Sequence, residues 1–238
     1  MDGKTRFGLI LGLSAIMAAL ILGIFFYEAQ KPKSTIQVVG LGLKEFEADT
    51  VKWVITVEEE TGPEEPIKTG YRRLENSIDV LKNMLTSLGI EEGEINLKTP
   101  TVYKDYNYNL GTVTRIRHNQ VLFVITKKID TVEKLAMNPV ELLDQDINVI
   151  NSQVEFFFSG TDELKKTLVS EATANAKERA QMMLKDTDVK LGKLISVRSG
   201  IFQITEPYST DVSSMGIYDT STRKKQISVT ATAVFALK

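Results

Sequence analysis

The sequence predicts an α+β fold in which an antiparallel sheet carries helices on one face, preceded by one transmembrane helix. Three observations lead to this prediction. Residues 7–27 form an apolar stretch, several later segments alternate apolar and polar residues, and two long segments carry apolar residues at spacings of three and four. We therefore divide the chain into a membrane anchor with its linker, residues 1–33, and one α+β domain, residues 34–238.

The anchor prediction rests on Phe7–Tyr27, which contains no charged residue. About 20 apolar residues in a helix span a hydrocarbon core of roughly 30 Å. The alternatives are a cleaved signal peptide and a buried core helix. Signal peptides have shorter apolar cores and small residues at the cleavage site, whereas this stretch ends in Phe25, Phe26 and Tyr27. We expect an uncleaved signal-anchor that makes the protein a single-pass membrane protein.

The charges beside the apolar stretch predict its orientation only weakly. Lys4, Arg6 and the α-amine precede it, and Lys31 and Lys33 follow it, with Glu28 adding little. Because positive charges are retained on the cytoplasmic side, this balance slightly favours an extracytoplasmic domain.

Apolar periodicity assigns the elements of the first half of the domain. Trp53 lies on the apolar face of its strand and is expected in the core. The helix expected at residues 64–88 should end at Gly89. A polar tip is expected at residues 103–111. The expected elements are strands at residues 36–43, 51–57, 95–103 and 113–126 and a helix at residues 64–88.

The second half repeats this order after a short helix that contains Val132, Leu135 and Ala136, with Asp130 or Thr131 as its cap. Strands are expected at residues 147–158, 193–204 and 227–235, a helix at residues 162–185 capped by Ser159 or Thr161, and a polar stretch at residues 205–225. The buried stripe of that helix is expected to comprise Leu164, Leu168, Ala172, Ala176, Ala180, Met183 and Leu184.

Residues 50–127 and 147–237 therefore share the order strand, helix, strand, polar tip, strand. This shared order predicts a duplicated β-α-β-β unit, although few residues are identical between the two halves.

The side chains that most enzymes and metal sites require are scarce. The chain has no cysteine and one histidine, His118, which we expect to be a solvated strand residue. The common zinc and transition-metal sites therefore lack ligands. We expect the acidic groups at residues 58–60, 64–65 and 91–94 to be solvated, and Gly40-Leu41-Gly42 to be a bend in a strand. We predict no catalytic residue, no cofactor and no metal, and thus not an enzyme.

Net charge argues against nucleic acid as a partner. The whole chain has a net charge of −2. The first 33 residues hold four basic and two acidic side chains and so carry +2, which leaves a net charge of −4 on the remaining residues. Nucleic-acid binding requires a basic face that neutralises phosphates.

The two polar tips are the candidate contact sites. Tyrosine is favoured at protein contacts because it combines apolar area with a polar end. Each tip is either a solvated flexible loop or a contact surface between protomers or with another protein. The candidate contact residues are Tyr103, Tyr106, Tyr108, Tyr208 and Tyr218.

A series of short motifs crosses residues 35–237 in a recognisable order. The motifs are Ile36-Gln37-Val38-Val39-Gly40-Leu41-Gly42, Ala48-Asp49-Thr50, Leu85-Thr86-Ser87-Leu88-Gly89-Ile90, Ile95-Asn96-Leu97-Lys98-Thr99, Tyr106 and Tyr108, Asn119, Glu171-Ala172, Ala176-Lys177-Glu178-Arg179-Ala180, Leu191-Gly192-Lys193-Leu194 and Ile227-Ser228-Val229-Thr230-Ala231. Their order and spacing resemble the SIMPL family, also called domain of unknown function 541. The chain departs from the family pattern at Ala48, where a proline is usual, and at residues 113–117, where a glycine and a tyrosine are usual.

Members of this family are commonly exported, lack an established catalytic site and can assemble into rings or channel-like oligomers, and several are linked to envelope or oxidative-stress phenotypes. The resemblance strengthens the expectation of an extracytoplasmic domain and of a homo-oligomer. Our first hypothesis is a membrane-anchored, non-enzymatic protein that acts by self-assembly or partner binding. The alternatives are a small-ligand or metal-binding sensor on a membrane stalk, and a hydrolase that uses acidic groups alone.

Overall fold

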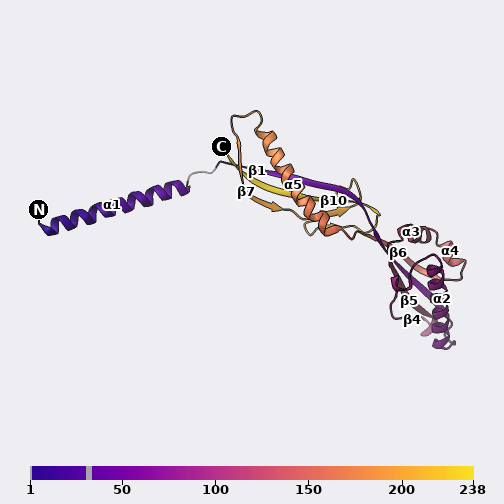
Figure 1. Cartoon of the computed structure of the whole chain (residues 1–238). Helices are drawn as coiled ribbons and strands as arrows, with labels where there is room; N and C mark the ends of the chain where they lie inside the picture. The colour runs from indigo at the N-terminus through magenta and orange to yellow at the C-terminus, as the bar shows by residue number, and fades with distance from the viewer. Residues whose placement is uncertain (1, 31–33) are drawn as a thin grey trace. The chain divides into compact units, whose positions relative to one another are not determined.

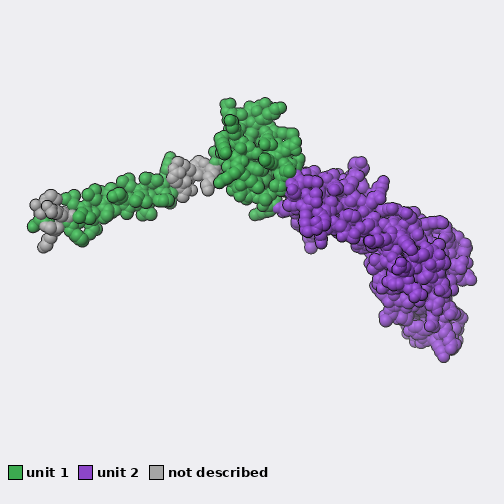
Figure 2. Space-filling model, in the orientation of Figure 1, with its two compact units in different colours: residues 1–40, 173–198, 231–238 green, residues 41–172, 199–230 purple. Residues whose placement is uncertain are grey.

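The computed structural model describes residues 2–30 and 34–238. It contains two compact units. One comprises residues 1–40, 173–198 and 231–238, and the other comprises residues 41–172 and 199–230 (Figure 2). Four elements contribute residues to both units, namely β1 Thr35–Glu47, α5 Thr161–Leu184, β7 Leu191–Ser199 and β10 Lys224–Leu237.

Helix α1 covers Gly3–Gln30 and contains the apolar stretch (Figure 1). Within it, Phe7–Tyr27 is long and apolar enough to cross a membrane, and none of this stretch is buried by protein. A soluble protein normally buries such a helix, so its exposure is consistent with an anchor or a signal sequence.

One sheet lies wholly in the second unit, and its strands pair in the order β3-β5-β2-β6, with β4 also on β5. Neighbouring strands are antiparallel, and β2 pairs with β5 from Val51 opposite Thr126 to Thr61 opposite Ile116. The strands are β2 Thr50–Thr61, β3 Ile95–Leu97, β4 Thr101–Asn107, β5 Thr112–Thr126 and β6 Val149–Phe157.

Helices cover one face of this sheet. Helix α2, Ile67–Ser87, and helix α3, Ile129–Met137, both pack on the face that carries Trp53. Trp53 is fully buried, as predicted, and its indole nitrogen donates to Ser152 Oγ at 2.9 Å. Gly89 follows α2 with φ of +89°, the left-handed conformation expected just beyond a helix end.

The other sheet contains β1, Thr35–Glu47, and β10, Lys224–Leu237, side by side. Helix α5, Thr161–Leu184, packs on one face of it. A Cβ added to Gly42 of β1 would lie 2.6 Å from the carbonyl oxygen of Leu168, so this glycine permits close packing of strand and helix. The sheet is completed by β7 Leu191–Ser199, β8 Gln203–Thr205 and β9 Ile217–Tyr218.

The α+β class and the placement of helices on one face of each sheet are confirmed, but the expectation of one sheet is wrong. Strand β6 begins the second predicted repeat, yet it pairs with β2 of the first. In the other sheet the neighbours of β10 are β1, β7 and β8. The predicted elements occur in the predicted order, with two strands split and with α4, Val140–Leu143, and β9 in addition, and the duplication itself stays a prediction.

Two predicted strands are each split in two. Residues 95–103 form β3 and the start of β4, separated by a stretch that ends at Pro100, which has no N–H for the ladder. Residues 193–204 form most of β7 and of β8, separated near Gly200. A Cβ on Gly200 would lie 2.4 Å from Thr230 Oγ1, so a close backbone approach interrupts the strand there.

Helix ends differ from the prediction as well. Helix α3 begins at Ile129 with Lys128 at the cap position and no side-chain cap, so neither Asp130 nor Thr131 caps it. Pro139 precedes a further short helix, α4, Val140–Leu143. At the start of α5, the two residues expected as caps both donate hydrogen bonds from their hydroxyl groups. Ser159 donates to Asp49 at 2.5 Å, and Thr161 donates to the carbonyl oxygen of Phe158 at 2.6 Å.

The buried stripe of α5 is confirmed for Leu164, Leu168 and the three alanines. Met183 was predicted to belong to this stripe but is exposed, because the contacts of α5 with the core of the first unit end at Ala180.

The prediction for His118 is wrong, because the side chain is fully buried. It lies opposite Glu59 in the strand pairing and faces α2. The His118 ring packs edge-on against Tyr71, with ring centroids 5.4 Å apart. A Cβ on Gly70 would lie 2.0 Å from His118 Nε2, so α2 has room for the ring only because residue 70 is glycine.

Candidate protein-contact site on the β4–β5 hairpin

The five candidate tyrosines lie in two groups within the second unit. Tyr103, Tyr106 and Tyr108 belong to the β4–β5 hairpin, and Tyr208 and Tyr218 belong to the segment between β8 and β10. The hairpin lies near Thr61 of β2, whereas Phe157, which stacks on Tyr218, pairs with Thr50 at the opposite end of that strand. At about 3.4 Å per residue these two ends are about 37 Å apart. The structure therefore does not bring the two groups together.

The first tip is narrower than predicted. Tyr103 and Tyr106 lie within β4, and only residues 108–111 form the turn. Gly111 has φ of +64°, and its N–H donates to the carbonyl oxygen of Asn107 at 2.8 Å. The Asn107 side chain accepts from the N–H groups of Asn109 and Leu110, so the turn has a defined conformation.

The hairpin displays apolar and aromatic side chains at its end. Tyr108 is 95% exposed and Leu110 is 72% exposed, and Tyr103 and Tyr106 are also exposed. Strand β4 pairs with β5 on one side and with no other described strand. Its second edge therefore presents backbone N–H and C=O groups that another chain can pair with.

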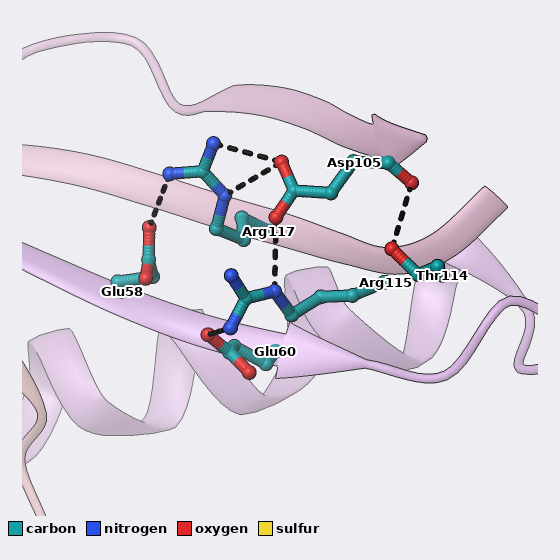
Figure 3. Close-up of polar contacts among 6 residues, drawn as sticks. All are labelled: Glu58, Glu60, Asp105, Thr114, Arg115 and Arg117. Carbon is teal, nitrogen blue, oxygen red and sulfur yellow. Dashed lines mark hydrogen bonds and ion pairs between the residues drawn. The ribbon is translucent and has the colours of Figure 1, made fainter. Parts of the chain in front are cut away.

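An ion-pair network joins the hairpin to β2 (Figure 3). Asp105 of β4 accepts from Arg115 Nε at 2.9 Å and from Arg117 Nη2 at 2.9 Å. Arg115 Nη1 also reaches Glu60 Oε1 at 2.8 Å, and Arg117 Nη1 lies 3.6 Å from Glu58 Oε2. The network thus links three adjacent strands through side chains on one face of the sheet.

The network has clear electrostatic consequences. Hydrogen bonds from Arg117, which has the larger effect, and from Arg115 lower the pKa of Asp105, because they stabilise the carboxylate. The same bonds raise the pKa of both arginines. Arg117 also lies over the ring of Tyr103, 5.9 Å from its centroid, so the charged network positions one of the exposed aromatic side chains.

Glu58 is the most buried member of this network. Its side chain belongs to a residue that is 5% exposed, and Oε2 has no hydrogen-bond partner among the described residues. Arg117 is the cation nearest to it. The expectation that residues 58–60 are solvated is therefore wrong for Glu58. Glu59 is partly buried and accepts from Ser77 Oγ at 2.7 Å, whereas Glu60 is exposed as expected and pairs with Arg115.

The ion-pair network is suited to binding rather than to acid–base catalysis. Arginine stays protonated at physiological pH, and Asp105 is already held by two arginines, so neither is poised as a general base. Among residues 2–30 and 34–238, no group of three or more His, Cys, Asp or Glu side chains is placed to hold a metal ion.

A concave site lies on the helix-covered face of the same sheet. It is a pocket of about 340 Å³ between α2 and the ends of β3 and β4. Carboxylates from successive turns of α2, Glu75 and Asp79, border it. Its lining residues are Tyr71, Leu74, Glu75, Ile78, Asp79, Leu97, Pro100 and Gln120.

The second group of tyrosines lies on an anchored loop. The Gln203 side chain donates to the carbonyl oxygen of Ser213 at 2.8 Å and accepts from its N–H at 3.2 Å. The buried Lys225 Nζ donates to the carbonyl oxygen of Asp219 at 2.5 Å. Burial lowers the pKa of Lys225, against the opposing effect of Asp219.

The two tyrosines of this group differ in exposure. Tyr208 is 88% exposed with φ of +65°, and Tyr218 stacks on Phe157 with centroids 6.3 Å apart. Tyr218 is 45% exposed, so part of its ring packs on the fold while Tyr208 extends almost wholly into solvent.

Sequence reasoning identified the tyrosines but missed the network of Glu58, Glu60, Asp105, Arg115 and Arg117. Charges at every second position of two strands were the available signal, since Glu58 and Glu60 share one face of β2, as Arg115 and Arg117 share one face of β5.

Comparison with known proteins completes this description. A search of curated proteins gives no match. A family model, SIMPL, described as protein of unknown function (DUF541), matches residues 36–235. This match covers nearly everything after the N-terminal helix, and the chain belongs to the SIMPL family.

Proposed function

We propose that this chain is a membrane-anchored, extracytoplasmic protein without enzymatic activity, which acts by binding protein through its β4–β5 hairpin. The observation that carries the proposal is the end of the hairpin. There Tyr108 and Leu110 are exposed on a turn of defined conformation, Tyr106 is exposed at the adjoining end of β4, and ion pairs join the hairpin to β2. Side chains held in advance lose less conformational entropy on binding, which favours affinity.

Helix α1 supports the membrane part of the proposal. Helix α1 is 28 residues long, and its uncharged stretch from Phe7 to Tyr27 suits a single membrane crossing. The slight excess of positive charge before the helix and the export habit of similar proteins support an extracytoplasmic location for the rest of the chain.

The partner of the hairpin is either a second copy of this chain or another protein. A free strand edge permits both, because backbone pairing is largely independent of sequence. Self-assembly is the outcome we favour, in line with the oligomers implied by the family resemblance. A role in envelope or stress maintenance would follow from such an assembly.

Site-specific photo-crosslinking tests this proposal on the full chain in its membrane. A photoreactive phenylalanine analogue replaces Tyr108 in one variant and Tyr208 in a matched control, because both positions are highly exposed and lie in different segments, the β4–β5 hairpin and the segment between β8 and β10. We expect an adduct from position 108 and little from position 208. An adduct at twice the chain mass of 26.6 kDa identifies self-assembly, and any other mass identifies a different partner.

The proposal is wrong if position 108 yields no adduct, or if both positions react equally. As a second readout, Tyr108→Lys with Leu110→Lys should abolish the adduct formed from a photoreactive group at position 106. Both substituted side chains are exposed, so their replacement leaves the fold intact.

The pocket beside α2 supports a second candidate function, a sensor for a small cationic ligand. Glu75 and Asp79 at its border favour positive charge. Thermal unfolding of the full chain with spermidine tests this function, because a ligand that binds only the folded state raises the melting temperature. The sensor function requires a rise that disappears in the Glu75→Gln, Asp79→Asn variant, and no rise excludes spermidine-like ligands.

A further inference from the structure

The turn between α5 and β7, residues 185–190, exposes a cluster of apolar side chains. Met182 and Met183 in the last turn of α5 are 63% and 62% exposed, and Val189 at the end of the turn is also exposed. Unbranched methionine adapts readily to irregular apolar surroundings, which makes it suitable for contact with a deformable partner.

Hydrogen bonds fix this turn beside the start of β1. The backbones of Lys190 and Lys238 exchange two hydrogen bonds, at 3.0 and 2.9 Å, and Leu237 N donates to Ser34 O at 2.9 Å. Ser34 and Lys190 therefore flank the end of β10. Two strand spacings of about 4.8 Å place them about 10 Å apart. Figure 1 shows the α5–β7 turn, the C-terminus and the start of β1 at one end of their sheet.

Covalent geometry places this end of the sheet close to α1. Helix α1 ends at Gln30, and Ser34 follows four residues later. Four residues reach at most about 14 Å even when fully extended. The aromatic residues Phe25, Phe26 and Tyr27 precede the helix end, where a membrane interface is expected. The α5–β7 turn is therefore within reach of the bilayer surface that α1 would cross.

The polar side chains of the turn also suit a bilayer surface. The exposed Lys185 and Lys190 lie at the two ends of the turn, with Asp186 and Asp188 between them, and the exposed Lys238 lies beside Lys190. Lysine places its ammonium group among lipid phosphates while its aliphatic stem lies along apolar surface. Apolar side chains flanked by lysines are the composition of interfacial membrane contacts.

We propose that the α5–β7 turn is a second membrane contact, which inserts Met182, Met183 and Val189 into the headgroup region of the phospholipid bilayer that α1 crosses. This inference rests on the proposed anchoring by α1. The contact adds to the anchor by restricting rotation of the first unit about the short linker.

Spin labelling tests the inference cleanly, because the chain has no cysteine of its own. Single cysteines are introduced by Met183→Cys at the end of α5, by Met17→Cys in α1 and by Leu110→Cys at the hairpin, all of them exposed positions. The labelled full chain is placed in nanodiscs of phosphatidylcholine and phosphatidylglycerol. Power saturation then compares collision of the label with oxygen, which enters lipid, and with a water-soluble nickel chelate.

We expect the oxygen-to-nickel ratio at position 183 to exceed that at position 110 several-fold and to lie below that at position 17. A ratio at 183 equal to that at 110, with 17 in lipid, overturns the second contact and leaves the anchor standing. A low ratio at 17 overturns both. Lys185→Glu with Lys190→Glu should lower the ratio at 183 without changing that at 17, since only the turn uses these lysines.

Discussion

At the scale of single residues, His118 illustrates how one side chain determines the identity of its neighbours. The ring fills the space between β5 and α2, with Nε2 3.2 Å from Thr61 Oγ1, while Nδ1 has no hydrogen-bond partner among the described residues. Gly70 is required because a Cβ there would overlap the ring.

Gly70→Ala is expected to destabilise the protein. Overpacking costs about 1–3 kcal/mol and is only partly offset by the roughly 1 kcal/mol that alanine gains over glycine inside a helix. Urea denaturation measures the change, and Gly93→Ala, where no atom lies within 4 Å of the added Cβ, is the control. In a His118→Ala background the substitution should become neutral or stabilising. An unchanged cost in that background would show that the ring is not the obstacle.

The burial of His118 also predicts how stability depends on pH. Desolvation lowers its pKa, and Glu59 opposes this effect only partly. The unfolded chain therefore takes up the proton first, near pH 6.5, so stability falls as pH decreases below this value. His118→Gln should reduce the loss between pH 7 and pH 5, as measured by urea midpoints. Parallel pH curves for the two proteins would contradict this explanation.

The ion-pair network predicts unequal effects for its two arginines. Arg117 faces the buried Glu58, whereas Arg115 faces the exposed Glu60. Arg117→Gln should therefore lower the urea midpoint more than Arg115→Gln, because it leaves a buried carboxylate without its cation. Adding Glu58→Gln to Arg117→Gln should recover part of the loss. Equal effects of the two single substitutions would indicate that Glu58 is effectively solvated.

At the scale of elements, the close packing of α5 on its sheet depends on small side chains. Ala176 is fully buried in the core that contains Val38, Ala233 and Phe235. Ala176→Leu should cost about 1–3 kcal/mol by overpacking. Ala174→Leu, on the exposed side of the same helix, is the matched control and should be nearly neutral. A similar cost at both positions would point to helix propensity rather than packing.

Apolar periodicity predicted most elements because it reflects which face of each segment is buried. The same periodicity places His118 on the buried face of β5, because Ile116, Leu122 and Val124 lie on that face. The network was not predictable in this way, because it depends on the register between β2 and β5, which are far apart in the sequence. The pairing of β6 with β2 is likewise a long-range choice that no local pattern specifies.

At the scale of the whole molecule, α1 is the feature on which the proposed membrane location depends. None of the apolar surface of Phe7–Tyr27 is buried by the protein. Burial of apolar surface contributes about 25 cal/mol per Å², so the helix is far more stable in lipid than in water. A cleaved signal peptide would present the same exposed helix before cleavage. An uncleaved anchor and a cleaved signal peptide therefore differ in whether the mature protein retains α1, and not in the fold of the remaining chain.

The intact mass and extraction behaviour of the mature protein distinguish these alternatives. We expect a membrane-bound protein at 26.6 kDa that alkaline carbonate does not release. Leu13→Lys with Leu20→Lys should shift the protein to the soluble fraction, since each lysine at a helix centre costs about 3 kcal/mol on insertion. Leu110→Lys at the hairpin should leave the protein in the membrane. A soluble protein that lacks the mass of its first thirty or so residues would instead identify a cleaved signal, and the hairpin would then act without a tether.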